Sequence, residues 1–386
     1  MKRFIYFFSV MAFLSGTAFA QDGLFSNFQE AKPATVKVLL QKNVAKVFLE
    51  VQGGYVIQNI DTDSAITAIR KGRKAFLSAS NDIINWNEEI SSIPDLRIVP
   101  ANAESQILLN GMEYKGCLEI HNQNGKLTLI NEVDVENFLK ATLPFKFTEN
   151  LEPEVWQAVA IAERTSLYFL GQKKPYVSWH FKAEDVDYQG VGSTFQDTDC
   201  ENAVQATRHT VLTYQNRLFP ALITNDSGGK TSDFSSIFRK KIAAPTGVVI
   251  PAIYRKDIDT SWSFQISKSE LEKLFEMEDI FGVDLFSDRK SDKIYALRLR
   301  NEGSSKEIDF FSLQKAFGVN RLRSSSFIIE LSGENVIFKG SGVGHGVGLC
   351  LSSSNIMAKN GVKAPKILSS FFPNTEVKRM RKASQL

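Results

Sequence analysis

The stretch GSGVGHGVGLCLSSSNIMAKNGVKAPKILSSFFPNTEV, residues 340–377, begins with glycines at alternate positions on both sides of His345. These are Gly340, Gly342, Gly344, Gly346 and Gly348. Alternate glycines remove every second Cβ, so one side of the segment is bare backbone that another chain segment or a ligand can approach closely. Taken alone, the pattern fits a glycine-rich turn with a structural histidine as well as it fits a binding loop.

The composition is that of a globular protein. The chain has 386 residues, of which 43% are hydrophobic and 23% are charged, enough for one large domain or two with a sizeable core. The formal net charge of +3 is too small to indicate a nucleic-acid partner. Phenylalanine dominates the aromatic content with 29 residues, which favours core packing over a stacking surface.

The N-terminus has the pattern of a secretory signal peptide. Lys2 and Arg3 precede an apolar run that is too short to span a bilayer, and Ala18-Phe19-Ala20 supplies small residues for cleavage. We therefore expect residues 1–20 to be removed and the protein to be exported to the periplasm or to the extracellular cell wall. No later run reaches transmembrane length, so no transmembrane segment is expected after signal cleavage.

Three cysteines, Cys117, Cys200 and Cys350, lie far apart in the chain. Three cysteines can form at most one disulfide, which leaves one thiol unpaired. The chain has no CxxC motif and no Cys/His cluster, so a structural zinc site of the usual spacing is not expected. We interpret all three cysteines as small, buried apolar residues.

The first hundred residues of the mature chain have strand patterning. Short β-branched runs between residues 34 and 60 are separated by polar breaks, and residues 21–105 are predicted to form a mainly β region. The β pattern continues to residue 133, where Asn124-Gly125 predicts a two-residue hairpin turn. His121 borders this turn and is expected to be an exposed polar residue.

Residues 134–170 have a helical pattern. Asp134 can cap a first helix that Pro144 ends, and a second helix is expected to begin near Thr148 or Asn150 and to end at Gly171. The second helix is apolar on more than one side, so it should lie buried in the middle of its domain. Glu163 falls on one of its apolar stripes, where a carboxylate needs a partner or a function. The predicted fold class is therefore α+β, with a central buried helix.

The segments after residue 170 alternate between helical and strand patterns. Residues 199–214 predict a helix leading into a strand, with His209 at the junction, and residues 223–234 form a polar, glycine-containing loop of the type that carries sites. Its SGGKT sequence lacks the spacing of a phosphate-binding loop. Further on, residues 267–286 predict an amphipathic helix with Ser269 as a candidate cap, and β segments follow around a short helix at 310–317.

Three ordered blocks resemble the SpoIID/LytB family, which contains stage II sporulation protein D and amidase-enhancer proteins. The blocks are NEVDVENFLKATLP with EVWQAVAIAERT, then AVQATRHTVLTYQNRLFPALITNDSGGKT, then GSGVGHGVGLC with KILSSFFPNTEV. The resemblance implies a SpoIID/LytB-like domain over residues 106–377. Residues 1–20 would then be the signal peptide, 21–105 a β-rich N-terminal region and 378–386 a basic tail.

The resemblance implies action on peptidoglycan. The best-described family members are lytic transglycosylases that cut glycan strands already stripped of stem peptides, and others act with wall amidases or enhance them. This chemistry needs one carboxylic acid that protonates the glycosidic oxygen and whose conjugate base then assists attack by the muramic 6-hydroxyl. In the resemblance, that acid falls at the same position when counted forward from Val135–Leu139 or backward from Glu154. This chain has Lys146 there, followed by Phe147. A lysine ammonium is a poor proton donor at neutral pH, and its charge disfavours an oxocarbenium-like state.

Other family positions are matched in this chain. Arg164 corresponds to an arginine that could bind sugar acetamide or lactyl groups, although a buried arginine paired with a carboxylate fits equally well. Ser227, Lys230 and His345, with Gly344 and Gly346 beside the histidine, are expected to contact substrate. Some family members bind zinc through a His/Cys segment, but this chain has Asp187-Tyr188 there, so we expect no metal and no cofactor.

Three functional hypotheses follow. The first is a glycan-binding protein that recognises peptide-stripped strands without cleaving them and recruits or stimulates an amidase. The second is an active lytic transglycosylase in which another carboxylate replaces the missing acid; Glu149, Glu152 and Glu163 are the nearest, and Glu163 is the most suggestive. The third, an unrelated hydrolase using Asp226, Ser227 and His345, has no support from spacing.

Overall fold

The computed structural model describes residues 35–80, 83–91, 94–147, 150–174, 177–191, 198–255 and 258–380. The expected signal peptide, Glu149 and the end of the basic tail lie outside these residues. Strands and helices are both abundant, and the predicted α+β class is confirmed. No helix within these ranges combines the length and the apolar character needed to cross a membrane.

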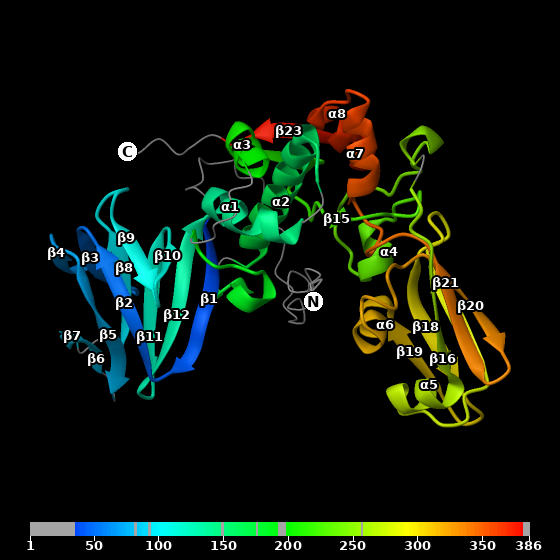
Figure 1. Ribbon diagram of the computed structural model, residues 1–386, viewed down its shortest axis with the longest axis horizontal. Helices are drawn as coiled ribbons and strands as arrows, with labels where there is room; N and C mark the ends of the chain where they lie inside the picture. Colours follow the sequence, from blue (N-terminus) through cyan, green and yellow to red (C-terminus); the bar gives the residue numbers. More distant parts are fainter. Residues whose placement is uncertain are drawn as a thin grey trace. The chain divides into compact units, whose positions relative to one another are not determined.

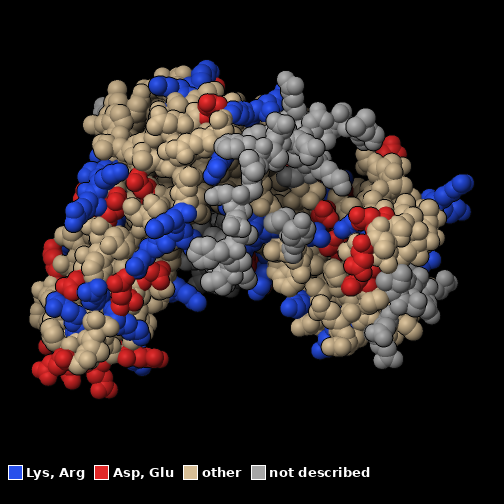
Figure 2. Space-filling view, turned by 180° about the vertical axis from the view of Figure 1, so that it is seen from behind, with Lys and Arg blue, Asp and Glu red and all other residues tan. Residues whose placement is uncertain are grey.

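The chain divides into two compact units (Figure 1). Unit 1 comprises residues 1–149, 167–209 and 380–386, and unit 2 comprises residues 150–166 and 210–379. Figure 2 shows that Lys and Arg side chains are interspersed with Asp and Glu on the face in view, in line with the small net charge.

Unit 1 is built on two β-sheets. The seven-stranded sheet has the order β13-β1-β12-β11-β8-β3-β4, and the six-stranded sheet has the order β10-β9-β2-β5-β6-β7. The strands are β1 (Thr35–Val44), β2 (Lys46–Gln52), β3 (Tyr55–Asn59), β4 (Ala65–Ile69), β5 (Arg73–Ser80), β6 (Ile83–Trp86), β7 (Glu88–Ser91), β8 (Asp95–Pro100), β9 (Gln106–Leu109), β10 (Met112–Tyr114), β11 (Cys117–Gln123), β12 (Lys126–Asp134) and β13 (Phe181–Lys182). Both sheets contribute to one hydrophobic cluster, for example through Trp86 and Leu118, so their inner faces bury each other.

The boundary expected at residue 105 does not coincide with a break in the strand pairing. Strand β1 pairs with β12, β8 pairs with β11, and β2 pairs with β9. The β-rich N-terminal region and residues 106–134 therefore form one sandwich, because each sheet takes strands from both sides of that position. The hairpin predicted at Asn124-Gly125 is confirmed: Gln123 pairs with Lys126, and both turn residues have positive φ.

His121 is not the exposed residue that its position beside the turn suggested. Its Nδ1 atom lies 2.8 Å from an oxygen of Asp95 on the neighbouring strand. The side chain of Glu119, on the same face of β11, is 1% exposed. Burial disfavours the charged form of Glu119, but hydrogen bonds from Arg97 and Lys37 and the nearby His121 ring outweigh it and lower the pKa of Glu119 to about 2. His121 is partly buried because it contacts residues of the neighbouring strand such as Asp95, and the local sequence does not reveal these contacts.

The helices of unit 1 follow β12 directly. Helix α1 (Val135–Lys146) is capped by Asp134, whose side chain accepts hydrogen bonds from the amides of Glu136 and Asn137, as predicted. It does not end at Pro144 but runs two residues further, because a proline in the last turn removes only one helical hydrogen bond. The unit also contains η1 (Ala183–Asp185) and α3 (Thr198–Ala206), and α3 packs on α1.

Helix α2 (Pro153–Lys173) gives its first part to unit 2 and its last part to unit 1. Nearly every side chain from Val155 to Leu170 is buried, which confirms the central buried helix of the predicted fold. Gly171 does not end the helix, which continues to Lys173, and no atom lies within 4 Å of where a Cβ on Gly171 would be.

The other elements of unit 2 follow residue 209. They are β14 (Thr210–Tyr214), β15 (Ile223–Thr224), α4 (Phe234–Phe238), η2 (Ala252–Tyr254), β16 (Trp262–Ser267), α5 (Lys268–Phe275), β17 (Gly282–Ser287), β18 (Ile294–Arg300), β19 (Ser305–Asp309), α6 (Phe310–Phe317), β20 (Phe327–Ser332), β21 (Asn335–Gly340), β22 (Leu349–Cys350), α7 (Leu351–Lys359), α8 (Ala364–Phe371) and β23 (Thr375–Arg379). Two three-stranded sheets, β16-β21-β20 and β17-β18-β19, share a phenylalanine-rich core with α5 and α6.

The helix predicted over residues 267–286 is much shorter in the structure. Helix α5 is capped by Ser267 rather than Ser269, and it ends at Phe275 with Glu276 in the left-handed conformation. The chain then becomes strand β17, which pairs with β18 from Gly282 onward. Pairing with a strand that lies later in the sequence outweighs the helical periodicity here. The short helix predicted at 310–317 is confirmed at both ends.

Candidate functional site

Two loops singled out from the sequence lie side by side in unit 2. The pair β15 and β22 is parallel, with Ile223 opposite Leu349 and Thr224 opposite Cys350. Beyond it, the backbones of Asp226 and Val343 exchange two hydrogen bonds of 3.0 and 2.8 Å. The amide of Ser232 donates to the carbonyl of Gly346 at 2.8 Å. The polar loop after β15 and the glycine run before β22 therefore form one structure, which we call the loop cluster (residues 224–232 with 342–350).

The glycine run is not an open backbone surface. Gly342, Gly344, Gly346 and Gly348 all have positive φ, so the run is a succession of turns rather than an extended strand. A Cβ at Gly344 would lie 2.5 Å from the hydroxyl of Thr224, and one at Gly348 would lie 2.1 Å from the carbonyl oxygen of Leu222. The space left by the missing side chains is filled by other parts of the chain, by side chains at Gly344 and Gly346 and by backbone at Gly348.

Asp226 holds the loop cluster together. The residue is 7% exposed, and one carboxylate oxygen accepts hydrogen bonds from the amide of Gly228 at 2.8 Å and from the hydroxyl of Thr260 at 3.0 Å. The other oxygen accepts from the hydroxyl of Ser352, at the start of α7. A buried carboxylate with three donors is well compensated and fixes the local backbone.

Lys293 is a member of this site that the sequence reasoning missed. It stands just before β18, it is 2% exposed, and its ammonium group donates to the backbone carbonyl of Ser227. Burial lowers the pKa of Lys293 to about 8, and the neighbouring Asp226 carboxylate opposes this effect only in part. A lysine before a strand is common, and nothing in the local sequence signals that this one is buried.

Ser227 is buried beside Lys293. It is 1% exposed, and its hydroxyl has no hydrogen-bond partner among the residues that the structure describes. Its amide donates to the sulfur of Cys350 at 3.4 Å. Cys350 and Cys200 are buried, as expected, whereas Cys117 is only partly buried.

The other two polar residues predicted on these loops keep some exposure. The side chain of Lys230 is 41% exposed and forms an ion pair of 2.6 Å with Asp292. His345 is half-buried: its Nδ1 accepts from the amide of Val347 at 3.1 Å, and its ring meets Phe238 edge to face at 5.4 Å. Since Nδ1 is an acceptor, the proton of a neutral His345 ring lies on Nε2.

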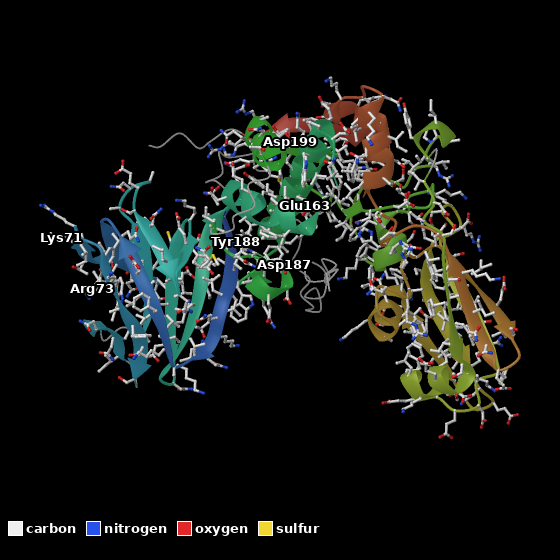
Figure 3. All side chains as sticks on the ribbon, in the orientation of Figure 1. Lys71, Arg73, Glu163, Asp187, Tyr188 and Asp199 are labelled. Atoms are coloured by element: carbon white, nitrogen blue, oxygen red, sulfur yellow. The ribbon has the colours of Figure 1, made fainter. Side chains whose placement is uncertain are left out.

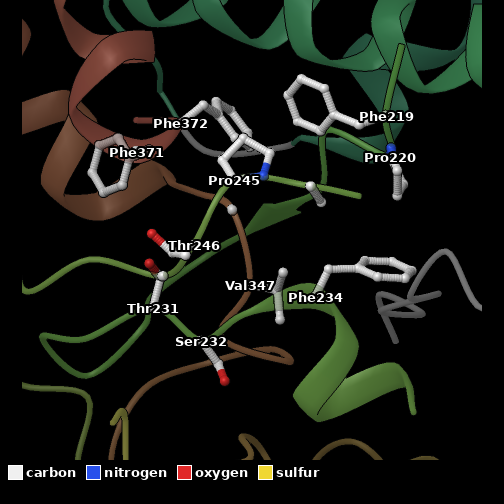
Figure 4. A pocket seen from close by; sticks show the side chains of 13 residues that line it. Phe219, Pro220, Thr231, Ser232, Phe234, Pro245, Thr246, Val347, Phe371 and Phe372 are labelled. Carbon is white, nitrogen blue, oxygen red and sulfur yellow. The ribbon is translucent and has the colours of Figure 1, made fainter. Parts of the chain in front are cut away.

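A small pocket opens beside the loop cluster (Figure 4). It is a shallow depression with a cavity volume of about 10 Å³, enough for about one water molecule. Aromatic and proline side chains form much of the wall (Figure 4): the lining includes Phe219, Pro220, Phe234, Pro245, Phe371 and Phe372 with Thr231, Ser232 and Thr246. Apolar walls with a few placed polar groups are typical of sites for small ligand groups.

The remaining predicted residues lie on helices α1 and α2. Arg164 on α2 is fully buried and donates to the carbonyl oxygens of Thr210 at 3.0 Å and Ala160 at 3.3 Å. The hydrogen bond to Thr210 joins α2 to the start of β14 inside the protein. Glu163, labelled in Figure 3, is 7% exposed on the same helix. Lys146 belongs to unit 1, where it is half-buried in the last turn of α1 with its ammonium 5.2 Å from the ring centre of Phe147.

Asp187 and Tyr188 lie in unit 1. Asp187 takes a left-handed conformation, and the Tyr188 hydroxyl donates to the side chain of Asn131 at 2.6 Å (Figure 3). Among the described residues, no group of three His, Cys, Asp or Glu side chains is placed to hold a metal ion.

Comparison with known proteins finds one matching family model and several similar proteins. The family model of SpoIID, stage II sporulation protein, matches residues 123–214. An uncharacterised protein of Chlamydia pneumoniae is 33% identical over 181 residues, which are 46% of this chain and 65% of that protein. An uncharacterised protein of Brachyspira hyodysenteriae is 25% identical over 284 residues, 70% of this chain and 73% of that protein. Stage II sporulation protein D of Bacillus subtilis is 21% identical over 271 residues, 64% of this chain and 75% of that protein. The match therefore spans just under two thirds of the Chlamydia protein's length.

Proposed function

Since this chain belongs to the SpoIID family through residues 123–214, we propose that it is an exported wall-remodelling protein that binds peptide-stripped glycan strands of peptidoglycan. Family membership by itself points to a protein related to sporulation or to the cell wall. The binding of glycan, and the absence of cleavage by this chain, are the proposed steps.

The observation that carries the binding proposal is the pocket beside the loop cluster. Both family-type loops contribute to it, with Thr231 and Ser232 from one and Val347 and Gly348 from the other. The apolar mouth of this depression suits a small group such as the methyl of an acetamide. Thr231 and Ser232 are 3% and 2% exposed, and their hydroxyl groups are hydrogen-bonded to Val248 and Asp288. Close packing of the glycine run holds these groups in place, which lowers the entropy cost of binding.

Lys146 supports binding without cleavage. It stands where the family pattern has its acid, and an ammonium group there neither donates a proton readily at neutral pH nor favours an oxocarbenium-like transition state. A binding protein of this kind would recruit or stimulate a wall amidase, which would produce stripped strands.

The alternative is a lytic transglycosylase that uses Glu163 as a substitute acid. Its low exposure favours this reading, since the reacting groups of such an enzyme are shielded from water. Against it, α2 is packed along nearly its whole length, so a glycan could reach Glu163 only if neighbouring side chains moved.

One experiment separates the two. Purified mature protein is incubated with peptide-free glycan strands, binding is followed by co-sedimentation, and anhydromuramic ends are sought by mass spectrometry. We expect binding without new ends. New ends in the wild type that Glu163→Gln abolishes, with Glu152→Gln as the matched control, would establish the alternative. Absence of any binding would contradict the proposal itself.

A further inference from the structure

The guanidinium group of Arg255 lies directly over Gly229 in the loop cluster. A Cβ at Gly229 would be 2.2 Å from the Arg255 Cζ atom and 2.4 Å from one terminal nitrogen. Gly229 has φ of +99°, a conformation that residues with a side chain rarely adopt. The glycine at this position therefore leaves the space in which the flat guanidinium group rests.

Most of the donors of Arg255 have no hydrogen-bond partner among the residues that the structure describes. One terminal nitrogen donates to the carbonyl of Gly228 at 3.4 Å, and the residue is exposed. Within the described ranges, no carboxylate is paired with Arg255, whereas the nearby Lys230 is paired with Asp292. A guanidinium group is planar and can donate two parallel hydrogen bonds to the two oxygens of a carboxylate.

The charge around Arg255 favours an anion. Repulsion from Lys230 and from Arg255 contributes to the lowered pKa of Lys293, after the larger effect of burial, so all three cations interact electrostatically. Asp226, the buried carboxylate of the cluster, has its oxygens occupied by Gly228, Thr260 and Ser352. An incoming carboxylate would therefore meet a surface with a local excess of positive charge.

Two exposed apolar side chains flank this position. Val249 is 71% exposed and forms a backbone bridge with Lys230, and Ile253 is 65% exposed on η2, two residues before Arg255. Large apolar side chains exposed beside a cationic group suit a ligand that carries an anion on a short apolar arm.

We propose that Arg255 is a specificity-determining residue that binds the lactyl carboxylate of muramic acid, with Val249 and Ile253 against the lactyl methyl group. This inference rests on the proposed function. Hydrolysis of the amide that joins the lactyl group to the stem peptide consumes one water and leaves a carboxylate on the sugar and an amine on the peptide. An intact strand has a neutral amide at the same place, so a guanidinium group at this position distinguishes stripped strands from intact ones by charge.

The test measures binding of peptide-free glycan strands to the full mature protein and its variants. Arg255→Gln should weaken binding about tenfold or more, because a charge-assisted contact is lost, and Arg255→Lys should recover part of it. Arg321→Gln is the control, since Arg321 is an arginine of the same unit whose side chain is 40% exposed and pairs with Glu270. In a second arm, the strand carboxylates are converted to methylamides. The wild type should bind these strands about as weakly as Arg255→Gln binds native strands, and Arg255→Gln should not distinguish the two.

The outcomes separate this inference from the proposed function. Wild-type binding of native strands that is unchanged by Arg255→Gln, or equal binding of native and amidated strands by the wild type, would overturn the role of Arg255 alone. A wild-type protein that binds no glycan strand would overturn the proposed function and the inference together.

Discussion

The ammonium group of Lys293 donates to the backbone carbonyl of Ser227, and its aliphatic stem occupies the space where a side chain at Gly346 would lie. One side chain thus joins the polar loop to the glycine run. The two sequence blocks that this lysine connects are more than a hundred residues apart, and the lysine itself belongs to neither block.

The first prediction concerns pH and Lys293. Its pKa is about 8 in the folded protein, lowered from 10.5 by burial, so between these values the unfolded chain binds more protons than the folded one. Stability relative to Lys293→Met should therefore rise with pH from about 8 to about 10.5, by up to roughly 3 kcal/mol. Urea unfolding of both proteins at several pH values measures the difference, in which other titrating groups cancel. A difference that stays constant across this range would contradict the burial of the charged amine.

The second prediction compares two glycines with nearly the same backbone conformation. Gly348 and Gly361 have φ of +82° and +80°, but a Cβ at Gly348 would lie 2.1 Å from the Leu222 carbonyl, whereas one at Gly361 would have no neighbour within 4 Å. Gly361→Ala should cost about 1–2 kcal/mol for the backbone conformation alone. Gly348→Ala should cost at least about 2 kcal/mol more, because the loops must separate. Equal losses in chemical denaturation would show that close packing at Gly348 contributes nothing.

The third prediction tests the start of α1. The Asp134 side chain accepts hydrogen bonds from the amides of Glu136 and Asn137. Asp134→Ala should lower the free energy of unfolding by about 1 kcal/mol, and Asp134→Asn, which keeps an acceptor, should lower it by much less. Thermal or urea unfolding measures both. If the two variants lose the same amount, charge rather than capping is the source of the stabilisation.

The fourth prediction addresses the acid position. Lys146→Glu places a carboxyl group where the family pattern has one, so we expect anhydromuramic ends to appear in digests of peptide-free strands above the wild-type level. Lys140→Glu, on an earlier turn of the same helix, is the control for added negative charge. A Lys146→Glu protein that binds strands yet produces no new ends would show that more than this one group is missing.

The fifth prediction concerns the thiols. Burial, followed by the nearby Glu132 carboxylate, raises the pKa of Cys117 to about 11, and Cys200 and Cys350 are buried. About one part in a thousand of Cys117 is thiolate at pH 8, so iodoacetamide should label the folded protein very slowly and the urea-unfolded protein at all three cysteines. Mass spectrometry counts the labels. Rapid labelling of any single cysteine in the folded state would contradict its placement.

Local signals in the sequence were sufficient for several elements. The hairpin at Asn124-Gly125, the cap at Asp134 and the helix Phe310–Phe317 depend on neighbouring residues, and the structure confirms them. The helix expected over 267–286 failed after Phe275, because its second half pairs with β18. A strand partner in a later part of the chain leaves no mark on local periodicity.

The sequence also indicated part of the candidate site, and only the tertiary structure showed the rest. The sequence indicated both loops of the cluster, since glycine and polar residues in these patterns restrict what the backbone can do, and it indicated the SpoIID resemblance that the family match supports. It could not show that the glycines are needed for contact between the two loops, that Lys293 lies buried between them, or that Arg255 rests on Gly229. Those relationships join residues distant in the chain, and the packing of the folded protein alone brings them together. The sequence thus shows that the run is rich in glycine, and the tertiary structure shows why: neighbouring residues fill the space where side chains would lie.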